Sequence, residues 1–402
     1  MKKSIFLGLV LFFSATLFAD DGVLFQFKHK KGDAVSHIST VQEEAYLNGR
    51  LNNTTEFINR TSTTIVDVDK DGSALLSTKY MTTQNSLVQR SGNYLSWGEE
   101  DSVNIHRKKT GELYDSDNQF LPTVRNIPSF PDRKVNVGES WTCEGLEVHD
   151  CREIFRMYDP IQIPFTANYT YTGTEEVNGV TLHVIEVDYE FYQENTRESM
   201  LNGSTYAGSR GFAHQRIYWD ISKNDIDHYV EQFQIKMVDI YGNLFVYNGQ
   251  SHGEVTEYHS VNDDENVKKL QKTINKYKLE NITVNRGEKG LTISLENIQF
   301  EPDSDKLLPS EKKKLEKIGS ILKEFSNDLL VTGHCAERGT VSARQKLSED
   351  RAKAVADFLV QGKIRDELHI FTQGKGSTQP VASNATEEGR SRNRRVEITI
   401  MD

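Results

Sequence analysis

The chain has 402 residues, and at roughly 150 residues per domain this length predicts two or three domains. It carries 48 lysine and arginine residues against 59 aspartate and glutamate residues, so its net charge is −11. An acidic chain has little affinity for phosphate backbones, and nucleic acid is therefore not an expected partner. The 36% hydrophobic and 27% charged residues also exclude the collagen-like and low-complexity classes.

The first residues have the parts of a secretory signal peptide. Lys2 and Lys3 form a charged start, residues 5–18 form an apolar run, and Ala19 offers a small residue for cleavage. The run is shorter than the roughly 20 residues that a membrane-spanning helix needs. We expect residues 1–19 to be the signal peptide of an exported, periplasmic protein, and we leave association with the outer membrane open. No cysteine lies near the cleavage point, so a lipoprotein anchor is not expected.

Residues 20–258 show the period-two alternation that is typical of half-buried strands. The clearest case is residues 181–192, and Asn178-Gly179 just before them is a pair typical of a type I′ hairpin turn. We predict a mainly β domain in which an antiparallel meander forms a curved sheet or half-barrel. A break into two subdomains near residues 145–165 is left open.

Two patterns in this region are related to metal and disulfide sites. Residues 67–72 open like an EF-hand loop, but Thr78 stands where that loop requires a glutamate, so an Asp-rich hairpin turn is expected. Cys143 and Cys151 could pair across a short loop in an oxidising compartment, which would stabilise the fold by about 2.6 kcal/mol in the chain-entropy model. Their spacing does not fit zinc, and no metal or cofactor is predicted.

Residues 259–290 are predicted to connect two domains. An acidic cluster typical of a helix start is followed by Leu270 and Ile274 at helical spacing. Turn-forming residues then occupy 281–290. We expect a linking helix followed by a short hinge.

From residue 291 to residue 402 the pattern alternates between strands and helices. The predicted strands are 291–298, 329–332, 368–371 and 395–400, and the predicted helices are 309–325 and 346–360. This βαβαββ order indicates an α+β sandwich with helices on one face of a sheet.

Four motifs occur in a fixed order in this C-terminal region. They are Gly333-His334 with Glu337-Arg338-Gly339-Thr340, then Leu347-Ser348-x-x-Arg351-Ala352, then Gly374-x-Gly376, and finally Gly389-Arg390-x-x-Asn393-Arg394-Arg395. Together they resemble the OmpA-like C-terminal domain family, which includes the peptidoglycan-associated lipoprotein. The resemblance covers residues 291–402.

The resemblance implies a domain that grips the peptide stem of peptidoglycan without a covalent bond. In this family an arginine on the second helix takes the carboxylate of the ligand, and an aspartate takes its amine, as suits the charges of both groups. The arginine corresponds to Arg351, but Ala336 occupies the aspartate position. The candidate peptidoglycan-binding residues are Phe300, His334, Ala336, Glu337, Arg344, Arg351 and Arg395.

The alanine at position 336 leaves several alternatives. Loss of one partner of a buried charge pair typically costs about 2–5 kcal/mol, which corresponds to roughly 1.5–3.5 decades of affinity. Either the site no longer binds peptidoglycan, or Glu337 or another acidic residue binds the amine, or the stem peptide differs from the usual one. Arg344, which replaces the polar asparagine of the family, could favour a ligand richer in carboxylate.

Further residues of this region have both a structural and a functional interpretation. We expect Cys335 to be a small, part-buried residue and not a reactive thiol. We expect His334 to hold the loop by a hydrogen bond and not to bind a metal. For residues 393–395, support of the fold and a contact with phosphate or sugar are equally compatible with the sequence.

No hydrolase elbow, zinc-protease motif or phosphate loop is present, so a non-catalytic protein is predicted. We expect a cell-envelope protein that is associated with peptidoglycan through residues 291–402, with outer-membrane or periplasmic proteins as further partners of the N-terminal domain. One alternative is a structural or assembly protein whose OmpA-like domain has lost peptidoglycan binding. Another is a carrier that holds an apolar ligand on the concave face of its curved sheet.

Overall fold

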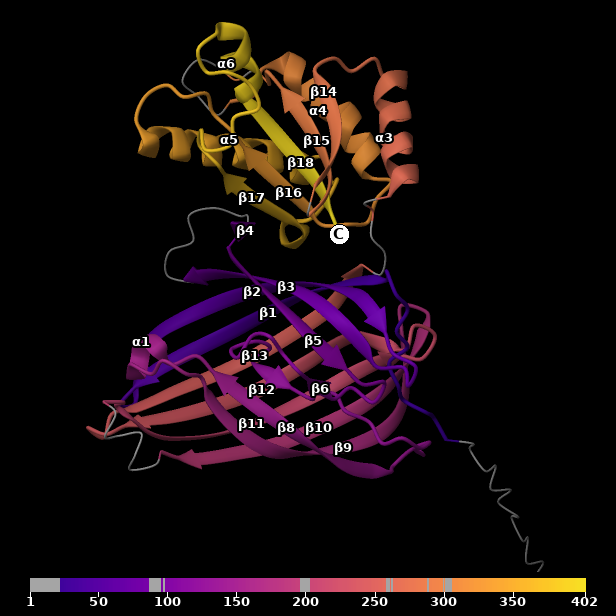
Figure 1. Cartoon of the computed structure of the whole chain (residues 1–402), viewed down its shortest axis with the longest axis vertical. Coiled ribbons are helices and arrows are strands. Elements are labelled where there is room, and N and C mark those ends of the chain that lie inside the picture. Colours follow the sequence, from indigo (N-terminus) through magenta and orange to yellow (C-terminus); the bar gives the residue numbers. More distant parts are fainter. Residues whose placement is uncertain are drawn as a thin grey trace, which may run out of the picture.

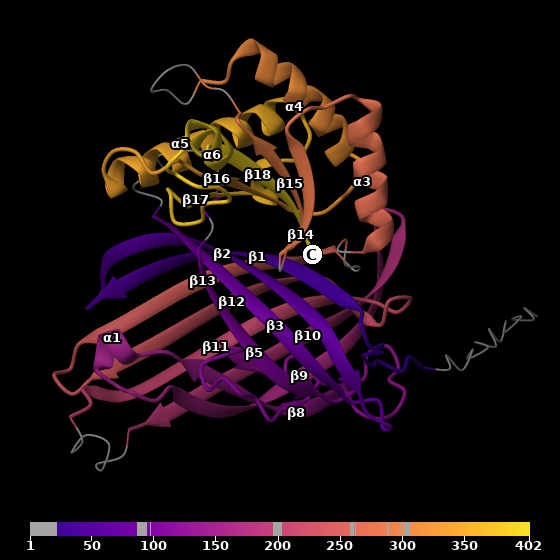
Figure 2. The same ribbon diagram turned by 45° about the horizontal axis from the view of Figure 1, so that its top comes forward.

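A computed structural model describes residues 22–86, 95–96, 98–195, 203–257, 261, 263–287, 289–298, 300 and 306–402. It contains two domains, a large β domain and a smaller α+β domain stacked on it (Figures 1 and 2). The predicted signal peptide lies outside the described residues. Within the described part of the chain, no helix combines the length and the apolar character needed to cross a membrane.

The N-terminal domain is one large curved sheet. Its strands are β1 (Ala34–Leu47), β2 (Arg50–Val68), β3 (Ala74–Ser86), β5 (Glu99–Arg107), β6 (Leu113–Tyr114), β7 (Val124–Arg125), β8 (Ser140–His149), β9 (Ile161–Val177), β10 (Val180–Glu194), β11 (Tyr206–Asp220), β12 (Asp225–Asp239) and β13 (Leu244–Glu257). The twelve strands are ordered β6-β5-β3-β2-β1-β13-β12-β11-β10-β9-β8-β7 and curve into a nearly closed wall (Figure 1). The predicted curved antiparallel meander is confirmed.

The alternation of side chains explains how this sheet is built. Along β9 the burial pattern strictly alternates from Ile161 to Tyr169, as expected for a strand with one face on a core. Asn178 and Gly179 both have positive φ, so the predicted hairpin turn joins β9 to β10. β8 and β9 pair along their length, and the sheet therefore continues without a break across residues 145–165.

The inner, concave face of β8–β11 is filled by a large aromatic core. Its largest fully buried side chains include Phe25, Phe155, Tyr169, Tyr206 and Trp219. Rings from the segment before β1 contribute directly, because Phe27 stands edge-on to Trp219 with ring centroids 5.0 Å apart. The inner face of β8–β11 is thus covered by tightly packed side chains.

The predicted disulfide between Cys143 and Cys151 is wrong, because both residues are free thiols. Cys143 lies within β8, and the six further residues to His149 extend by about 20 Å, whereas a disulfide needs Cα atoms within about 7 Å. Cys151 instead lies against Met237, with the sulfur atoms 3.9 Å apart. The sequence suggested a short loop where the chain is in fact an extended strand.

The C-terminal domain has the predicted α+β organisation. Its elements are α3 (Asp264–Lys276), β14 (Ile282–Gly287), β15 (Gly290–Glu296), α4 (Pro309–Leu322), β16 (Leu329–Gly333), α5 (Val341–Gln361), β17 (Ile370–Gly374), α6 (Glu387–Asn393) and β18 (Arg395–Met401). The sheet order is β14-β15-β18-β16-β17-β4, in which β4 (Leu95–Ser96) comes from the N-terminal domain. The order βαβαββ from β15 to β18 is confirmed, and the sequence missed the short helix α6.

The expected hinge at residues 281–290 is wrong. Residues 282–287 form β14, which pairs with β15 along its whole length. Helix α3 also belongs to this domain, because Leu270 and Ile274 are buried in the same apolar cluster as α4, α5 and the strands. The helix and the hairpin therefore extend the C-terminal domain instead of joining it flexibly to the rest.

The two sheets pack against each other at the domain interface. One face of the C-terminal sheet is covered by α3, α4 and α5. The other face contacts the outer, convex face of β1–β3, as Figures 1 and 2 show. Six buried apolar residues, three from each domain, form the contact: Ile38, Ile58, Met81, Leu330, Phe371 and Met401.

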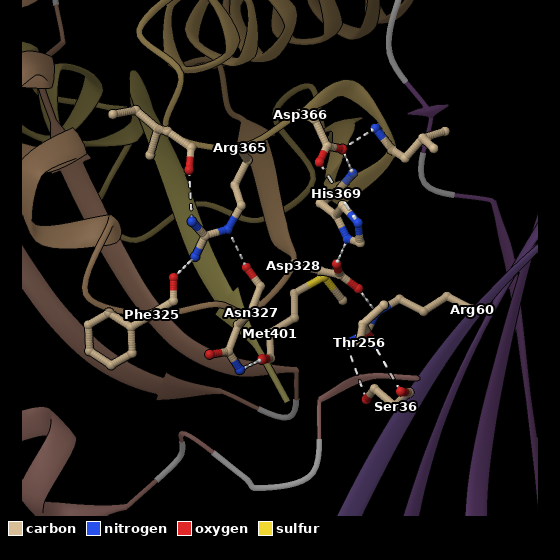
Figure 3. Close-up of polar contacts among 12 residues, drawn as sticks. Ser36, Arg60, Thr256, Phe325, Asn327, Asp328, Arg365, Asp366, His369 and Met401 are labelled. Carbon is tan, nitrogen blue, oxygen red and sulfur yellow. Dashed lines mark hydrogen bonds and ion pairs between the residues drawn. The ribbon is translucent and has the colours of Figure 1, made fainter. Parts of the chain in front are cut away.

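A buried ion pair crosses this interface. Arg60 on β2 donates from Nε to Asp328 Oδ2 at 2.8 Å, and the two side chains are 5% and 0% exposed (Figure 3). His369 contacts the other carboxylate oxygen of Asp328 through Nδ1 at 2.7 Å. Arg60 also donates from Nη2 to the main-chain oxygen of Asp402 at 2.6 Å, and Ser36 and Ser62 donate their hydroxyls to the same oxygen. Buried charged and polar atoms of each domain thus have their ion-pair and hydrogen-bond partners in the other domain.

The ionisation of this cluster follows from its contacts. Burial by itself raises the pKa of Asp328, but the hydrogen bond from His369 and the charge of Arg60 outweigh it, so that the pKa is lowered. The hydrogen bond to Asp328 raises the pKa of His369 against the effect of burial. The charged forms of all three residues therefore support one another.

We predict that Arg60→Met destabilises the protein by about 3–5 kcal/mol, because it leaves the buried carboxylate of Asp328 without its cation. Urea unfolding followed by fluorescence measures this change. The control is Lys31→Met, which removes an exposed ion pair with Asp67 and should cost about 1 kcal/mol or less. An Arg60→Met protein within 1 kcal/mol of wild type would contradict the proposed importance of the pair.

The interface should also depend on pH. The contribution of His369, whose pKa is raised, is complete below about pH 6.5 and is lost as the pH rises through its folded-state pKa. The contribution of Asp328, whose pKa is lowered, is present above about pH 4 and is lost as the pH falls through its folded-state pKa. Both are complete between about pH 4 and 6.5.

We therefore expect His369→Gln to reduce the unfolding free energy by about 1 kcal/mol more at pH 5.5 than at pH 9, because a charge-assisted hydrogen bond is stronger than a neutral one. Urea unfolding at the two pH values measures the difference. His214→Gln, which removes an exposed contact with Asp188, is the control and should cost about 1 kcal/mol or less at both pH values. A larger loss at pH 9 would refute the assignment.

Candidate functional site

The sequence motifs of the C-terminal domain meet where β16 ends. Gly333 closes β16, residues 334–340 form the following loop, and Thr340 caps α5 by accepting a hydrogen bond from the main-chain nitrogen of Ala343. This cap makes the helix begin at Val341, five residues before the predicted start. A Cβ on Gly333 would lie 2.0 Å from the main-chain oxygen of Ser348, so only glycine lets α5 lie this close to the strand.

Arg351 lies at the centre of this site. Its guanidinium carbon is 4.8 Å from the ring centroid of Phe300, which is a cation–π contact. Arg344 lies two turns earlier on α5 and donates from Nη1 to the main-chain oxygen of Gly339 at 2.6 Å. The structure therefore brings Phe300 and Arg351 together and uses Arg344 to hold the loop before the helix.

The loop before α5 combines two small, buried side chains with an exposed acidic one. Cys335 and Ala336 are buried, at 6% and 7% exposure, whereas Glu337 is exposed. The Cys335 thiol donates to the main-chain oxygen of Arg344 at 3.5 Å, and burial raises its pKa although Arg351 and Arg344 act in the opposite direction. A thiol with a raised pKa is a weak nucleophile, which agrees with the small, part-buried role expected for Cys335.

His334 and Arg395 do not face this loop but form a separate buried cluster with Glu397. His334 Nε2 lies 3.3 Å from one carboxylate oxygen of Glu397, and Arg395 Nε donates to the other at 2.7 Å. Burial alone would raise the pKa of Glu397, but His334 and Arg395 lower it to about 2. Burial lowers the pKa of His334, so this histidine is neutral at pH 7. Both residues hold β18 to the start of the loop.

Asn384 and Asn393 were not among the predicted site residues. They hold the neighbouring loops together by hydrogen bonds. Asn393 is buried, accepts hydrogen bonds from the main-chain nitrogens of Val381 and Ala382, and donates to Asn384 Oδ1 at 2.9 Å. Asn384 Oδ1 in turn accepts from the main-chain nitrogen of Glu337 at 3.1 Å. The Asn-Arg-Arg motif therefore supports the loops here. The only sign of this supporting role in the sequence was that Asn393 belongs to the C-terminal motif.

The chemistry of the arrangement is that of an anion-binding surface. A guanidinium that lies over an aromatic ring suits a carboxylate. Among the described residues, no group of three or more His, Cys, Asp or Glu side chains could hold a metal ion.

The site faces away from the N-terminal domain. Asp328, which anchors the interface, immediately precedes β16, and His334 immediately follows it. A five-residue strand separates these points by about 16 Å. Domain packing and the candidate site thus use opposite ends of the same strand.

Comparison with known proteins identifies this domain. Residues 299–394 match the OmpA family, which confirms the resemblance seen in the sequence: the C-terminal part of the chain is an OmpA-family domain.

The similar proteins named here match the chain over about a quarter to a third of its length. "Peptidoglycan-binding protein ArfA" of Mycobacterium tuberculosis is 39% identical over 104 residues, which are 26% of this chain and 32% of that protein. "Outer membrane protein A" of Bordetella avium is 39% identical over 103 residues, 25% of this chain and 53% of that protein. The solved structure of the cell wall anchor of the T6SS from Pseudomonas aeruginosa is 31% identical, covers 33% of this chain and 96% of that chain, and has a TM-score of 0.30. The chain spans about a third to a half of the length of these two curated relatives.

We predict that Asn393→Ala destabilises the domain by about 2–4 kcal/mol, because main-chain groups of Val381 and Ala382 lose their buried partner. Hydrogen exchange should show faster exchange at these two amides, and urea unfolding measures the free energy. Arg394→Ala removes only an exposed ion pair with Glu387 and is the control, with an expected cost of about 1 kcal/mol or less. Equal losses in the two variants would contradict the supporting role of Asn393.

Proposed function

We propose that this protein is an exported, non-catalytic protein of the cell envelope that holds the peptide stems of peptidoglycan through its OmpA-family domain. The observation that carries the proposal is the guanidinium of Arg351, stacked on Phe300 beside the loop after β16. Non-covalent capture of a stem carboxylate needs such a preorganised cation and no catalytic group. The name of the similar mycobacterial protein supports the same ligand class.

The ligand site differs from the usual pattern of the family at position 336. Ala336 offers a methyl group where a carboxylate would pair with the amine of the stem peptide. Glu337 is exposed on the same loop and is the nearest acid in sequence that could take that role. We propose that binding is weak or directed to a stem peptide with a different balance of amine and carboxylate groups.

A second candidate function is a structural or assembly role in which peptidoglycan binding has been lost. Ala336 favours it, because no acidic side chain replaces the missing one at that position. The buried Arg60–Asp328 pair also favours it, because it makes the OmpA-family domain a fixed part of a larger body. In either case we propose a periplasmic location, with outer-membrane or periplasmic proteins as partners of the N-terminal domain.

Sedimentation of the full chain with purified peptidoglycan distinguishes the two functions. We expect wild type to bind and Arg351→Ala to bind at least about 30-fold more weakly, because the stem carboxylate loses a charged, fork-shaped partner. Lys346→Ala is the control, since it removes an exposed positive charge from the same helix and should bind like wild type.

The variant Ala336→Asp decides between the alternatives. If wild type does not bind but Ala336→Asp does, the fold is intact and the site has been retired, which supports the second function. If neither protein binds, peptidoglycan is not the ligand and the first proposal fails. If wild type and Arg351→Ala bind equally well, binding does not use this site and the first proposal also fails.

A further inference from the structure

The inner face of the N-terminal sheet carries two buried apolar clusters, the aromatic core and a second one on β2, β3 and β5, formed by Ile65, Ala74, Leu76, Val103 and Ile105. The aromatic core occupies the part formed by β8–β11. On β12 and β13 the apolar side chains of the inner face are only partly buried: Tyr229, Phe233, Ile235, Phe245 and Tyr247.

The strand register shows which residues lie on the same inner face of the sheet as these partly buried side chains. Gln215, Glu231, Ser251, Val41 and Phe57 lie directly opposite one another in successive strands from β11 to β2. Opposite residues of paired strands point to the same face of a sheet. The domain interface uses the other face, because Ile38 and Ile58 have the opposite alternation.

An aromatic side chain lies flat on this face. A Cβ on Gly249 would be 2.0 Å from the ring of Phe233, so the ring covers the glycine of the neighbouring strand. The ring therefore forms part of the inner wall of the sheet. Val41 and Phe57, both partly buried, continue this apolar wall onto β1 and β2.

Two carboxyl groups interrupt the apolar wall. Glu231 accepts a hydrogen bond from Gln215 at 2.6 Å, and Glu43 lies opposite Gly249 on β1. Among the described residues, neither of them pairs with a lysine or arginine. Burial raises the pKa of Glu231 to about 7, with the charge of Glu147 acting in the same direction, and burial also raises the pKa of Glu43.

We propose that the inner face of β12, β13 and β1 binds an amphiphile with an apolar chain and a cationic amine head, with the chain on Phe233 and Tyr247 and the head at Glu231. The apolar wall matches the chain, and the two carboxyl groups match the positive head by charge. A carboxylate head would meet negative charge without a cation and is disfavoured. This site is separate from the peptidoglycan-binding site and does not depend on it.

Calorimetry with the full chain and three probes of equal chain length tests the proposal: dodecylammonium, dodecanol and dodecanoate, each below its micelle concentration. We expect dodecylammonium to bind at least 10-fold more tightly than dodecanoate. Glu231→Gln should remove most of this preference, whereas Glu44→Gln, which changes an exposed acid on the outer face of β1, should keep it. Arg351→Ala should bind the probes like wild type.

A second variant tests the same site without changing its charge. Val41→Trp places a bulky ring on the same face as Glu231 and should weaken the binding of all three probes at least 10-fold, with unchanged thermal unfolding as the check on its fold. The proposal is overturned if no probe binds wild type, if dodecanoate binds as tightly as dodecylammonium, if Glu231→Gln keeps the preference, or if a folded Val41→Trp protein binds like wild type.

Discussion

The buried pair of Arg60 and Asp328 determines how this molecule is arranged. Neither charge could remain buried in its own domain without the other, because an unpaired buried ion costs several kcal/mol. His369 and the main-chain oxygen of Asp402 complete the hydrogen bonds of the two groups. The pair therefore fixes the face of the C-terminal sheet that is opposite its helices onto the outer face of β1–β3, as Figure 3 shows in detail.

This arrangement separates two surfaces with different chemistry. Arg351 and Phe300 lie at the far end of β16, outside the domain contact. Glu231 and its apolar neighbours lie on the inner face of the other domain. One surface offers positive charge and the other negative charge, so the two select different ligands.

Much of the C-terminal domain could be predicted because its signals are local. The motif residues and the helical and strand periods lie within short windows, and they predicted the βαβαββ order and the OmpA-like family correctly. The errors arose where long-range contacts decide. Residues 282–287 became a strand because β15 pairs with them, and Cys143 and Cys151 lie far apart because β8 runs straight along β9. His149 on β8 is buried and lies 3.0 Å from the carboxylate of Glu147 on the same strand.

The sequence by itself determined the strand and helix periods, the turn at Asn178-Gly179, and the motifs of the OmpA-family domain. Only the tertiary structure decided the joining of the two halves of the sheet through the pairing of β1 with β13, the stacking of the two domains, and the partial burial of the inner face of β12 and β13. The physical reason is distance along the chain. Alternation and turn preference act over a few residues, whereas Arg60 and Asp328 are 268 positions apart and meet only when both domains have folded.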